Sequence, residues 1–277
     1  MAKNRPLSQE KAVFSKADRR LLRLLSWLLL TLFALSYAGE PPKAVGSLYL
    51  QTPQKYLCTA SIVAGAELGV DLERVVLTAA HCVEKSLLKD PVTKTWQSKH
   101  AFEVSFGGEQ TFEVYPYRVG FASTGFDLAI LRFVDEAPDI APLSMGEWDE
   151  VDLGSAIQNY ANPMGMGLQY FTGTVTMTDL KPSPTNKKPN WHHNAVASVQ
   201  VGPGSSGSLI LNASQEYIGV LSSVMEAKFG SPFTIFVPQW RFEDFLNESK
   251  AGRDLDCTPC ELNEQAFFAR MDGAVFR

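Results

Sequence analysis

Hydrophobic and polar residues alternate along much of this chain with a period of two. The alternation covers residues 102–106 and 112–114 in the first half and residues 196–201 and 217–221 in the second half. Successive side chains of a β-strand point to opposite faces, so this period predicts strands with one buried face. No internal repeat or low-complexity tract interrupts the pattern. The pattern therefore favours an all-β protein.

Three segments lack the alternation. Residues 138–152 are acidic and contain two prolines, and we assign them as a linker between the two halves of the chain. Residues 181–194 are rich in Pro, Lys and Asn, which predicts an exposed loop. A helix is expected over residues 239–249, because Pro238 is compatible with a helix start and Trp240 can pack back onto the sheet.

The first 38 residues have the pattern of a targeting segment. Residues 1–23 carry seven Lys or Arg against two Asp or Glu, and residues 24–38 contain no charged residue. Small residues stand at the −3 and −1 positions before Gly39, as signal peptidase requires. We expect residues 1–38 to be a signal peptide that is removed on export. The alternative is an uncleaved anchor, the one case in which we expect membrane contact. The uncharged run is shorter than the roughly 20 residues that span a bilayer.

Removal of that segment leaves an acidic chain. Residues 1–23 contribute +5 to a total net charge of −5, so residues 39–277 carry −10. This balance argues against nucleic acid as a partner, because no basic patch is evident that would neutralise phosphates. The remaining length suits two small packed barrels and leaves no room for a further domain of ordinary size.

Three short motifs place a histidine, an aspartate and a serine in one order along the chain. The motifs are LTAAHC at residues 77–82, DLAIL at residues 127–131 and GSSGS at residues 204–208. His81 precedes Asp127 by 46 residues, and Asp127 precedes Ser206 by 79 residues. The order His, Asp, Ser is one of a few that solve the geometry of a catalytic triad, and it differs from the orders in subtilisin and the α/β-hydrolases.

These motifs, with their flanking residues, resemble the trypsin/chymotrypsin-like serine peptidases over residues 44–249. The resemblance implies two six-stranded antiparallel β-barrels followed by a short C-terminal helix. It assigns residues 39–137 to the first barrel, residues 153–250 to the second barrel and the helix, and residues 251–277 to a tail.

The resemblance also implies a role for each residue of the motifs. His81 and Asp127, in the first barrel, act as the general base and as the group that orients it. Ser206, in the second barrel, acts as the nucleophile. The backbone amides of Gly204 and Ser206 stabilise the oxyanion. The expected function is a serine endopeptidase that acts on a protein or peptide through an acyl-enzyme, with no cofactor and no metal.

The four cysteines form two pairs along the sequence. By resemblance, Cys58 pairs with Cys82 in an exported chain and holds His81 against the neighbouring strand. The closed loop of about 25 residues would contribute roughly 3–4 kcal/mol in the chain-entropy model. Cys257 and Cys260 fit a metal half-site, a redox motif or a local disulfide. No second pair completes a four-ligand shell, so we expect the disulfide.

Two further segments resemble the bacterial HtrA-like branch of the family. They are NPMG at residues 162–165 and FTGTV at residues 171–175. The nucleophile turn departs from that branch at Ser205 and Ser208, and Ser208 is similar to glutamyl endopeptidase-like enzymes. Digestive relatives have an aspartate at the position of Ser205 that captures a new amino terminus, so we expect no such zymogen switch. The chain after the helix is too short for a PDZ domain. We expect a secreted or periplasmic protein, from a bacterial envelope by preference.

The resemblance also locates the primary specificity pocket. Gln200 falls at its floor, and Ser222 and Val224 fall in its wall. A preference for Lys or Arg is not expected, because no Asp is at the floor. A branched side chain at Val224 narrows the pocket, which predicts small or medium apolar residues on the amino side of the scissile bond.

Two alternatives share this fold. A catalytically silent binding module would keep both barrels, with Ser205 and Ser208 distorting the oxyanion turn. A non-peptidase acyl hydrolase would use the same chemistry, and activity on peptide against ester substrates separates it from a peptidase.

Overall fold

The computed structural model describes residues 41–51, 54–107, 110–182, 184, 188–225, 233–247 and 252–255. The expected signal peptide at residues 1–38 and the Cys257–Cys260 pair lie outside the described residues. Within those residues, no helix combines the length and the apolar character needed to cross a membrane.

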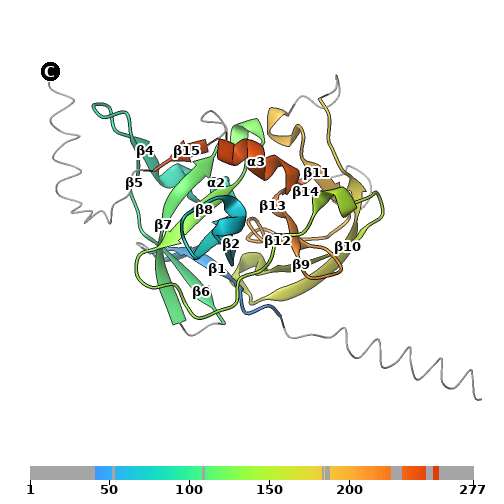
Figure 1. Cartoon of the computed structure of the whole chain (residues 1–277), viewed down its shortest axis with the longest axis horizontal. Coiled ribbons are helices and arrows are strands. Elements are labelled where there is room, and N and C mark those ends of the chain that lie inside the picture. Colours follow the sequence, from blue (N-terminus) through green and yellow to red (C-terminus); the bar gives the residue numbers. More distant parts are fainter. Residues whose placement is uncertain are drawn as a thin grey trace, which may run out of the picture. The chain divides into compact units, whose positions relative to one another are not determined.

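Six antiparallel strands close into a first barrel in the order β7-β6-β1-β2-β3-β8, because β8 pairs back onto β7 (Figure 1). These strands are β1 (Val45–Leu50), β2 (Lys55–Ala64), β3 (Arg74–Thr78), β6 (Phe102–Phe106), β7 (Gln110–Gly120) and β8 (Ala129–Phe133). A short strand, β15 (Gly252–Asp254), pairs antiparallel with residues 118–120 of β7.

A second barrel closes in the order β10-β11-β14-β13-β12-β9. Its strands are β9 (Ala156–Ala161), β10 (Gln169–Met177), β11 (Ala195–Ala197), β12 (Leu209–Leu211), β13 (Tyr217–Met225) and β14 (Phe233–Pro238). Neighbouring strands are antiparallel here too. The two closed barrels confirm the expected all-β fold.

Short elements complete the described chain. A two-stranded sheet pairs β4 (Leu87–Lys89) with β5 (Trp96–Ser98). The α-helices are α2 (Ala80–Val83) and α3 (Trp240–Asn247). The 3-10 helices are η1 (Ala66–Leu68), η2 (Glu84–Ser86), η3 (Ala122–Thr124), η4 (Trp148–Glu150), η5 (Pro163–Gly165) and η6 (Pro189–Trp191). The expected C-terminal helix is therefore present as α3.

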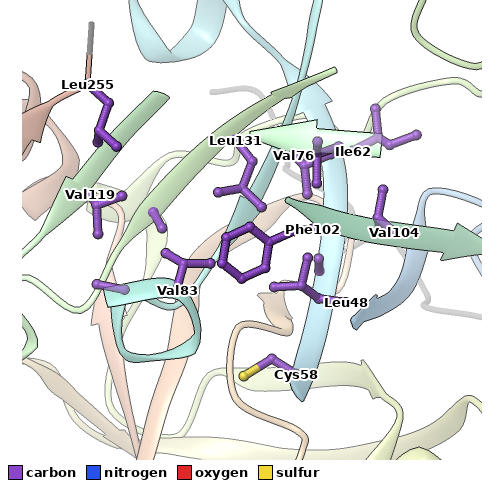
Figure 2. Packing of buried hydrophobic residues seen from close by; sticks show 14 of the residues in the cluster. Leu48, Cys58, Ile62, Val76, Val83, Phe102, Val104, Val119, Leu131 and Leu255 are labelled. Carbon is purple, nitrogen blue, oxygen red and sulfur yellow. The ribbon is translucent and has the colours of Figure 1, made fainter. Parts of the chain in front are cut away.

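The first barrel is filled by apolar side chains from its strands. Figure 2 shows the ring of Phe102 near the middle of this cluster, with Leu48, Val83 and Leu131 around it. Phe102 and Leu48 have no exposed surface. Burial of each side chain of this size contributes roughly 1.5–3 kcal/mol. Leu255, after β15, joins the same cluster, so the chain beyond the second barrel returns to the first.

A second apolar cluster joins residues of both barrels. It contains Leu77 and Ile130 from the first barrel, Val220 from the second, and Phe242 and Phe245 from α3. These side chains are almost completely buried. Strands β3 and β8 therefore bury both faces, one in their own barrel and one against this shared cluster. The packing holds the ends of these strands in place, and the candidate catalytic residues lie at those ends.

Candidate active site

His81 and Asp127 come together at the ends of two paired strands. His81 lies in α2, which follows β3, and Asp127 lies two residues before Ala129, the first residue of the apolar strand β8. The Thr78–Ala129 pair in the β3–β8 register brings the two chain segments side by side. As a result, Nδ1 of His81 lies 2.7 Å from Oδ2 of Asp127, and the backbone N–H of His81 donates to Oδ1 at 2.8 Å.

A third donor reaches the same carboxylate from the second barrel. The hydroxyl of Ser222, in β13, donates to Oδ2 of Asp127 at 2.7 Å. We expected Ser222 in the wall of the specificity pocket; its hydroxyl supports Asp127, and its place in the pocket wall stays a prediction. Asp127 is 3% exposed, and both oxygens of its carboxylate accept hydrogen bonds.

The contact with Asp127 determines which ring nitrogen of His81 carries the proton. An ionised carboxylate can only accept, so Nδ1 of His81 carries the hydrogen and Nε2 is unprotonated in the neutral ring. Burial lowers the pKa of His81, but the hydrogen bond to Asp127 and the charge of that residue raise it, and the net pKa lies above its usual value. About 39% of the His81 side chain is exposed, which leaves the ring open to solvent.

Ser206 comes from the second barrel, in the turn before β12. Its hydroxyl donates to the carbonyl of Ser222 at 3.5 Å, a long contact. The described residues contain no hydrogen bond between Ser206 and the ring of His81. Catalytic hydrogen bonds in structures without substrate are often long or poorly aligned, and they tighten when substrate binds. Ser222 thus contacts Ser206 through its carbonyl and Asp127 through its hydroxyl.

The turn of residues 204–208 leaves two amides without an internal partner. The amides of Ser205, Gly207 and Ser208 each donate to a backbone carbonyl at 2.8–3.1 Å. In the described part of the chain, those of Gly204 and Ser206 donate to no group. Gly204 adopts a φ of 90°, in the left-handed region that glycine tolerates. These are the two amides that we expected, from the sequence, to stabilise the oxyanion.

Residues of the first barrel hold the carbonyl groups of this turn. The backbone N–H of Thr59 donates to the carbonyl of Ser206 at 3.0 Å. The hydroxyls of Thr59 and Tyr56 donate to the carbonyl of Gly204 at 3.0 and 2.6 Å. The hydroxyl of Tyr56 also contacts the carbonyl of Asn162. The nucleophile turn is therefore tied to β2.

Gly207 allows the turn to approach the chain that carries His81. A Cβ at this position would collide with the hydroxyl of Thr78 and would lie 2.8 Å from the amide of Ala79. Its φ of 82° is also one that other residues rarely adopt. Only glycine fits there, and the close approach sets the nucleophile turn against the entry to α2.

The two serines that depart from the HtrA-like pattern are buried. The hydroxyl of Ser208 accepts a hydrogen bond from Nδ2 of Asn159 at 2.8 Å. The hydroxyl of Ser205 has no partner among the described residues. Neither side chain forms a hydrogen bond with the free amides of Gly204 and Ser206. The serines at positions 205 and 208 therefore do not block these two amides.

The Cys58–Cys82 bond joins β2 to α2. Their Cα atoms lie 6.2 Å apart. Both sulfurs lie within 4.8 Å of a ring nitrogen of His81. Because the sulfurs are bonded to each other, this Cys–His–Cys group is not a free set of metal ligands.

The other residues assigned to the specificity pocket lie on the second barrel. Gln200 is exposed and Val224 is half-buried in β13. Val224 stands opposite Thr234 of β14. Thr234 is fully buried, and its hydroxyl donates to the carbonyl of Val199 at 2.6 Å. Thr234 was not predicted from the sequence.

A cavity of about 580 Å³ lies beside α3 and η1. Its lining includes the aromatic residues Tyr117, Trp148 and Trp240 together with several carboxylates. It contains none of the triad, turn or pocket residues described above. We therefore assign no catalytic role to it.

Comparison with known proteins places this geometry in a family. The profile described as "Trypsin-like peptidase domain" matches residues 58–220, more than half of the chain and a span that includes His81, Asp127 and Ser206. The chain therefore belongs to the trypsin-like peptidase domain family.

Individual relatives are distant. The serine protease PepD of Mycobacterium tuberculosis (strain ATCC 25618 / H37Rv) is 25% identical over 113 residues, which are 39% of this chain and 24% of PepD. The HtrA-type protease AlgW with a tripeptide has a TM-score of 0.54 at 17% identity, covering 74% of this chain and 59% of AlgW. AlgW with a decapeptide has a TM-score of 0.56 at 15% identity, covering 74% and 63%. The AlgW likeness supports the fold, and this chain spans less than two thirds of each relative.

Proposed function

We propose that this protein is a serine endopeptidase that uses Ser206, His81 and Asp127. The observation that carries the proposal is the pair of contacts made by Ser222. Its hydroxyl donates to Asp127, and its carbonyl accepts from the hydroxyl of Ser206. This residue connects the nucleophile of one barrel to the buried carboxylate of the other. Family membership supports the same reaction class.

The chemistry follows from the assigned proton positions. Nε2 of His81 takes the hydroxyl proton of Ser206 as Oγ bonds to the carbonyl carbon of the substrate, and the π electrons move to the carbonyl oxygen. The free amides of Gly204 and Ser206 stabilise that oxyanion, each worth roughly 3 kcal/mol. Collapse of the intermediate expels the amine, which takes the proton from His81. Water then repeats the sequence on the acyl-enzyme.

Asp127 acts by orientation and charge. It keeps Nδ1 of His81 protonated, so that Nε2 faces the reaction as the base, and it stabilises the imidazolium that forms. Its three donors, two from His81 and one from Ser222, hold the carboxylate in one orientation. A carboxylate held in this way need not reorganise during the reaction.

We further propose that the substrate residue on the amino side of the scissile bond is small or medium and apolar. Val224 and Thr234 form a cross-strand pair, and side chains at such positions approach closely. Thr234 has no exposed surface, so Val224 is the branched side chain of this pair that narrows the pocket. The exposed amide of Gln200 supplies no charge for Lys or Arg.

The proposal also includes export. A disulfide next to His81 persists in an oxidising compartment, which fits the targeting pattern of residues 1–38. The protein would then work outside the cytoplasm, in a bacterial envelope or in the medium. Protein or peptide is the expected partner.

Turnover of matched substrates tests the proposed function. The full-length chain, expressed with its leader and recovered from the exported fraction, is assayed on a peptide amide and on the ester of the same acyl group. We expect hydrolysis of both, with Ser206→Ala inactive on both. Ester hydrolysis without amide hydrolysis would assign an acyl hydrolase that is not a peptidase. Equal turnover by the parent and Ser206→Ala would overturn the proposal.

A further inference from the structure

The amide of Gly204 must point in a fixed direction to stabilise an oxyanion. The side chain of the next residue, Ser205, does not fix that direction. Ser205 is fully buried, and its hydroxyl makes no hydrogen bond among the described residues. No charged side chain stands at that position to anchor the turn. The anchoring contacts of Gly204 come instead from the peptide groups on its two sides.

The peptide group before Gly204 is held by the second barrel. The carbonyl of Pro203 accepts a hydrogen bond from the backbone N–H of Met164 at 2.7 Å. A trans peptide is planar, with its N–H pointing opposite to its carbonyl. The bond to Pro203 therefore sets the direction of the Gly204 N–H. Met164 itself adopts a φ of 55°, which is uncommon for a residue with a side chain.

The peptide group after Gly204 is held by the first barrel. Its carbonyl accepts from the hydroxyl of Tyr56 at 2.6 Å and from that of Thr59 at 3.0 Å. With both flanking peptides restrained, rotation of Gly204 requires at least one of these bonds to break. Glycine has the widest conformational freedom of any residue, so it depends on such restraints more than other residues do.

Tyr56 and Thr59 also hold the segment that carries Met164. The hydroxyl of Tyr56 contacts the carbonyl of Asn162, and the backbone N–H of Asn162 donates to the hydroxyl of Thr59 at 3.0 Å. A phenol has one hydrogen, so the carbonyls of Asn162 and Gly204 converge on a single donor. Removal of that donor takes the phenol contact from the carbonyl of Asn162 and leaves the carbonyl of Gly204 with the hydroxyl of Thr59 alone.

The ring of Tyr56 is packed against the same two segments. A Cβ built on Gly204 would lie 2.6 Å from Cε1 of Tyr56, and one built on Gly165 would lie 3.4 Å from its Cγ. The ring of Tyr49 meets Tyr56 edge to face, with centroids 5.6 Å apart. Burial raises the pKa of Tyr56 to about 12, so the phenol keeps its proton at neutral pH and remains a donor.

We propose that Tyr56 is a positioning residue whose hydroxyl holds the Gly204 peptide in the orientation that binds the oxyanion. This inference rests on the proposed function. Tyr56 acts through Gly204 and touches no reacting atom. It acts on the transition state and the tetrahedral intermediate and not on the bound substrate, because the substrate carries no oxyanion.

Tyr56→Phe tests this role, because it removes the donor and keeps the ring. Tyr49→Phe is the matched control, since the hydroxyl of Tyr49 makes no hydrogen bond among the described residues. We expect Tyr56→Phe to lower kcat for a peptide amide by about tenfold or more, with KM within about twofold, as loss of transition-state stabilisation predicts. Tyr49→Phe should keep both parameters within about twofold.

A second readout separates positioning from a general structural role. A peptide aldehyde forms a hemiacetal with Ser206, and the oxygen of that hemiacetal needs the Gly204 amide. The corresponding peptide alcohol forms no hemiacetal and does not need this amide. Tyr56→Phe should weaken aldehyde binding by about the same factor as kcat and leave alcohol binding unchanged. Thr59→Val, which removes the other hydroxyl on the same carbonyl, should act in the same direction and serves if Tyr56→Phe does not fold.

The outcomes are distinguishable. Parent-like kcat and aldehyde affinity in folded Tyr56→Phe, or in Thr59→Val if only that variant folds, would overturn the positioning role while leaving the triad intact. Equal losses for the aldehyde and the alcohol would also overturn it, because they indicate a damaged pocket. A parent that neither turns over peptide nor binds the aldehyde would overturn the proposed function itself, and this role with it.

Discussion

The hydroxyl of Ser222 in the second barrel donates a 2.7 Å hydrogen bond to the carboxylate of Asp127 in the first. Ser222→Ala leaves the carboxylate with the two donors of His81. We expect kcat/KM to fall roughly five- to tenfold, which corresponds to a hydrogen bond of about 1–1.5 kcal/mol. Steady-state kinetics on a peptide amide measures the effect.

Ser223→Ala is the control for that variant. Its hydroxyl makes no hydrogen bond among the described residues, so kcat/KM should stay within about twofold. Equal losses in the two variants would mean that the strand, and not the bond to Asp127, determines the activity.

The pH dependence of kcat/KM should report the titration of His81. The base must be neutral to act, so kcat/KM rises as pH rises through the pKa of His81 in the free enzyme. That pKa is raised by Asp127, so the midpoint should lie above the unperturbed value of about 6.5. Asp127→Asn removes the negative charge, so the midpoint in residual activity should move down. A parent midpoint below the unperturbed value would contradict this reading.

Loss of the Cys58–Cys82 bond should reduce both stability and activity. The bond closes a loop over a sequence separation of 24 residues. For a loop of this length the chain-entropy model predicts a loss of about 3–4 kcal/mol in the free energy of unfolding. Urea unfolding of Cys58→Ala/Cys82→Ala measures it. Activity should fall as well, because the bond lies next to His81.

Cys257→Ser/Cys260→Ser is the matched control for the disulfide. It removes two cysteines that lie outside the described residues and leaves the bond beside His81 intact. Its unfolding midpoint should remain sensitive to dithiothreitol, whereas that of Cys58→Ala/Cys82→Ala should not. The reverse pattern would refute a stabilising role for the Cys58–Cys82 bond.

The specificity pocket should widen when Val224 is truncated. Val224→Gly removes one of the two branched side chains in the pair with Thr234. We expect kcat/KM for Phe relative to Ala, on the amino side of the scissile bond, to increase by at least about tenfold. A series of peptides that differ only at that residue measures the ratio. An unchanged ratio would place the pocket elsewhere.

The barrels and the candidate triad could be predicted because their signals are local in the sequence. Residues 102–106 alternate and form β6 with the predicted bounds. His81, Asp127 and Ser206 each lie in a short run with characteristic neighbours. The predicted strand at residues 196–201 is only partly observed, since β11 ends at Ala197.

Other features depend on contacts that no local pattern encodes. Tyr56 and Gly204 are 148 residues apart. Strand β3 buries both faces and therefore shows no alternation that would mark it. We expected residues 251–277 to form a tail, but among its described residues, 252–255, β15 pairs with β7 and Leu255 joins the apolar cluster of the first barrel. A three-residue strand is too short to show a period.

Intact-mass analysis after exposure to a fluorophosphonate tests the central claim most directly. The reagent phosphonylates a serine only when a base activates it and amides stabilise the developing charge. The exported parent protein should gain one adduct, located at Ser206 by peptide mapping, and Ser206→Ala should gain none. A folded parent without an adduct, or an adduct of equal yield in both proteins, would contradict the assignment of Ser206 as an activated nucleophile.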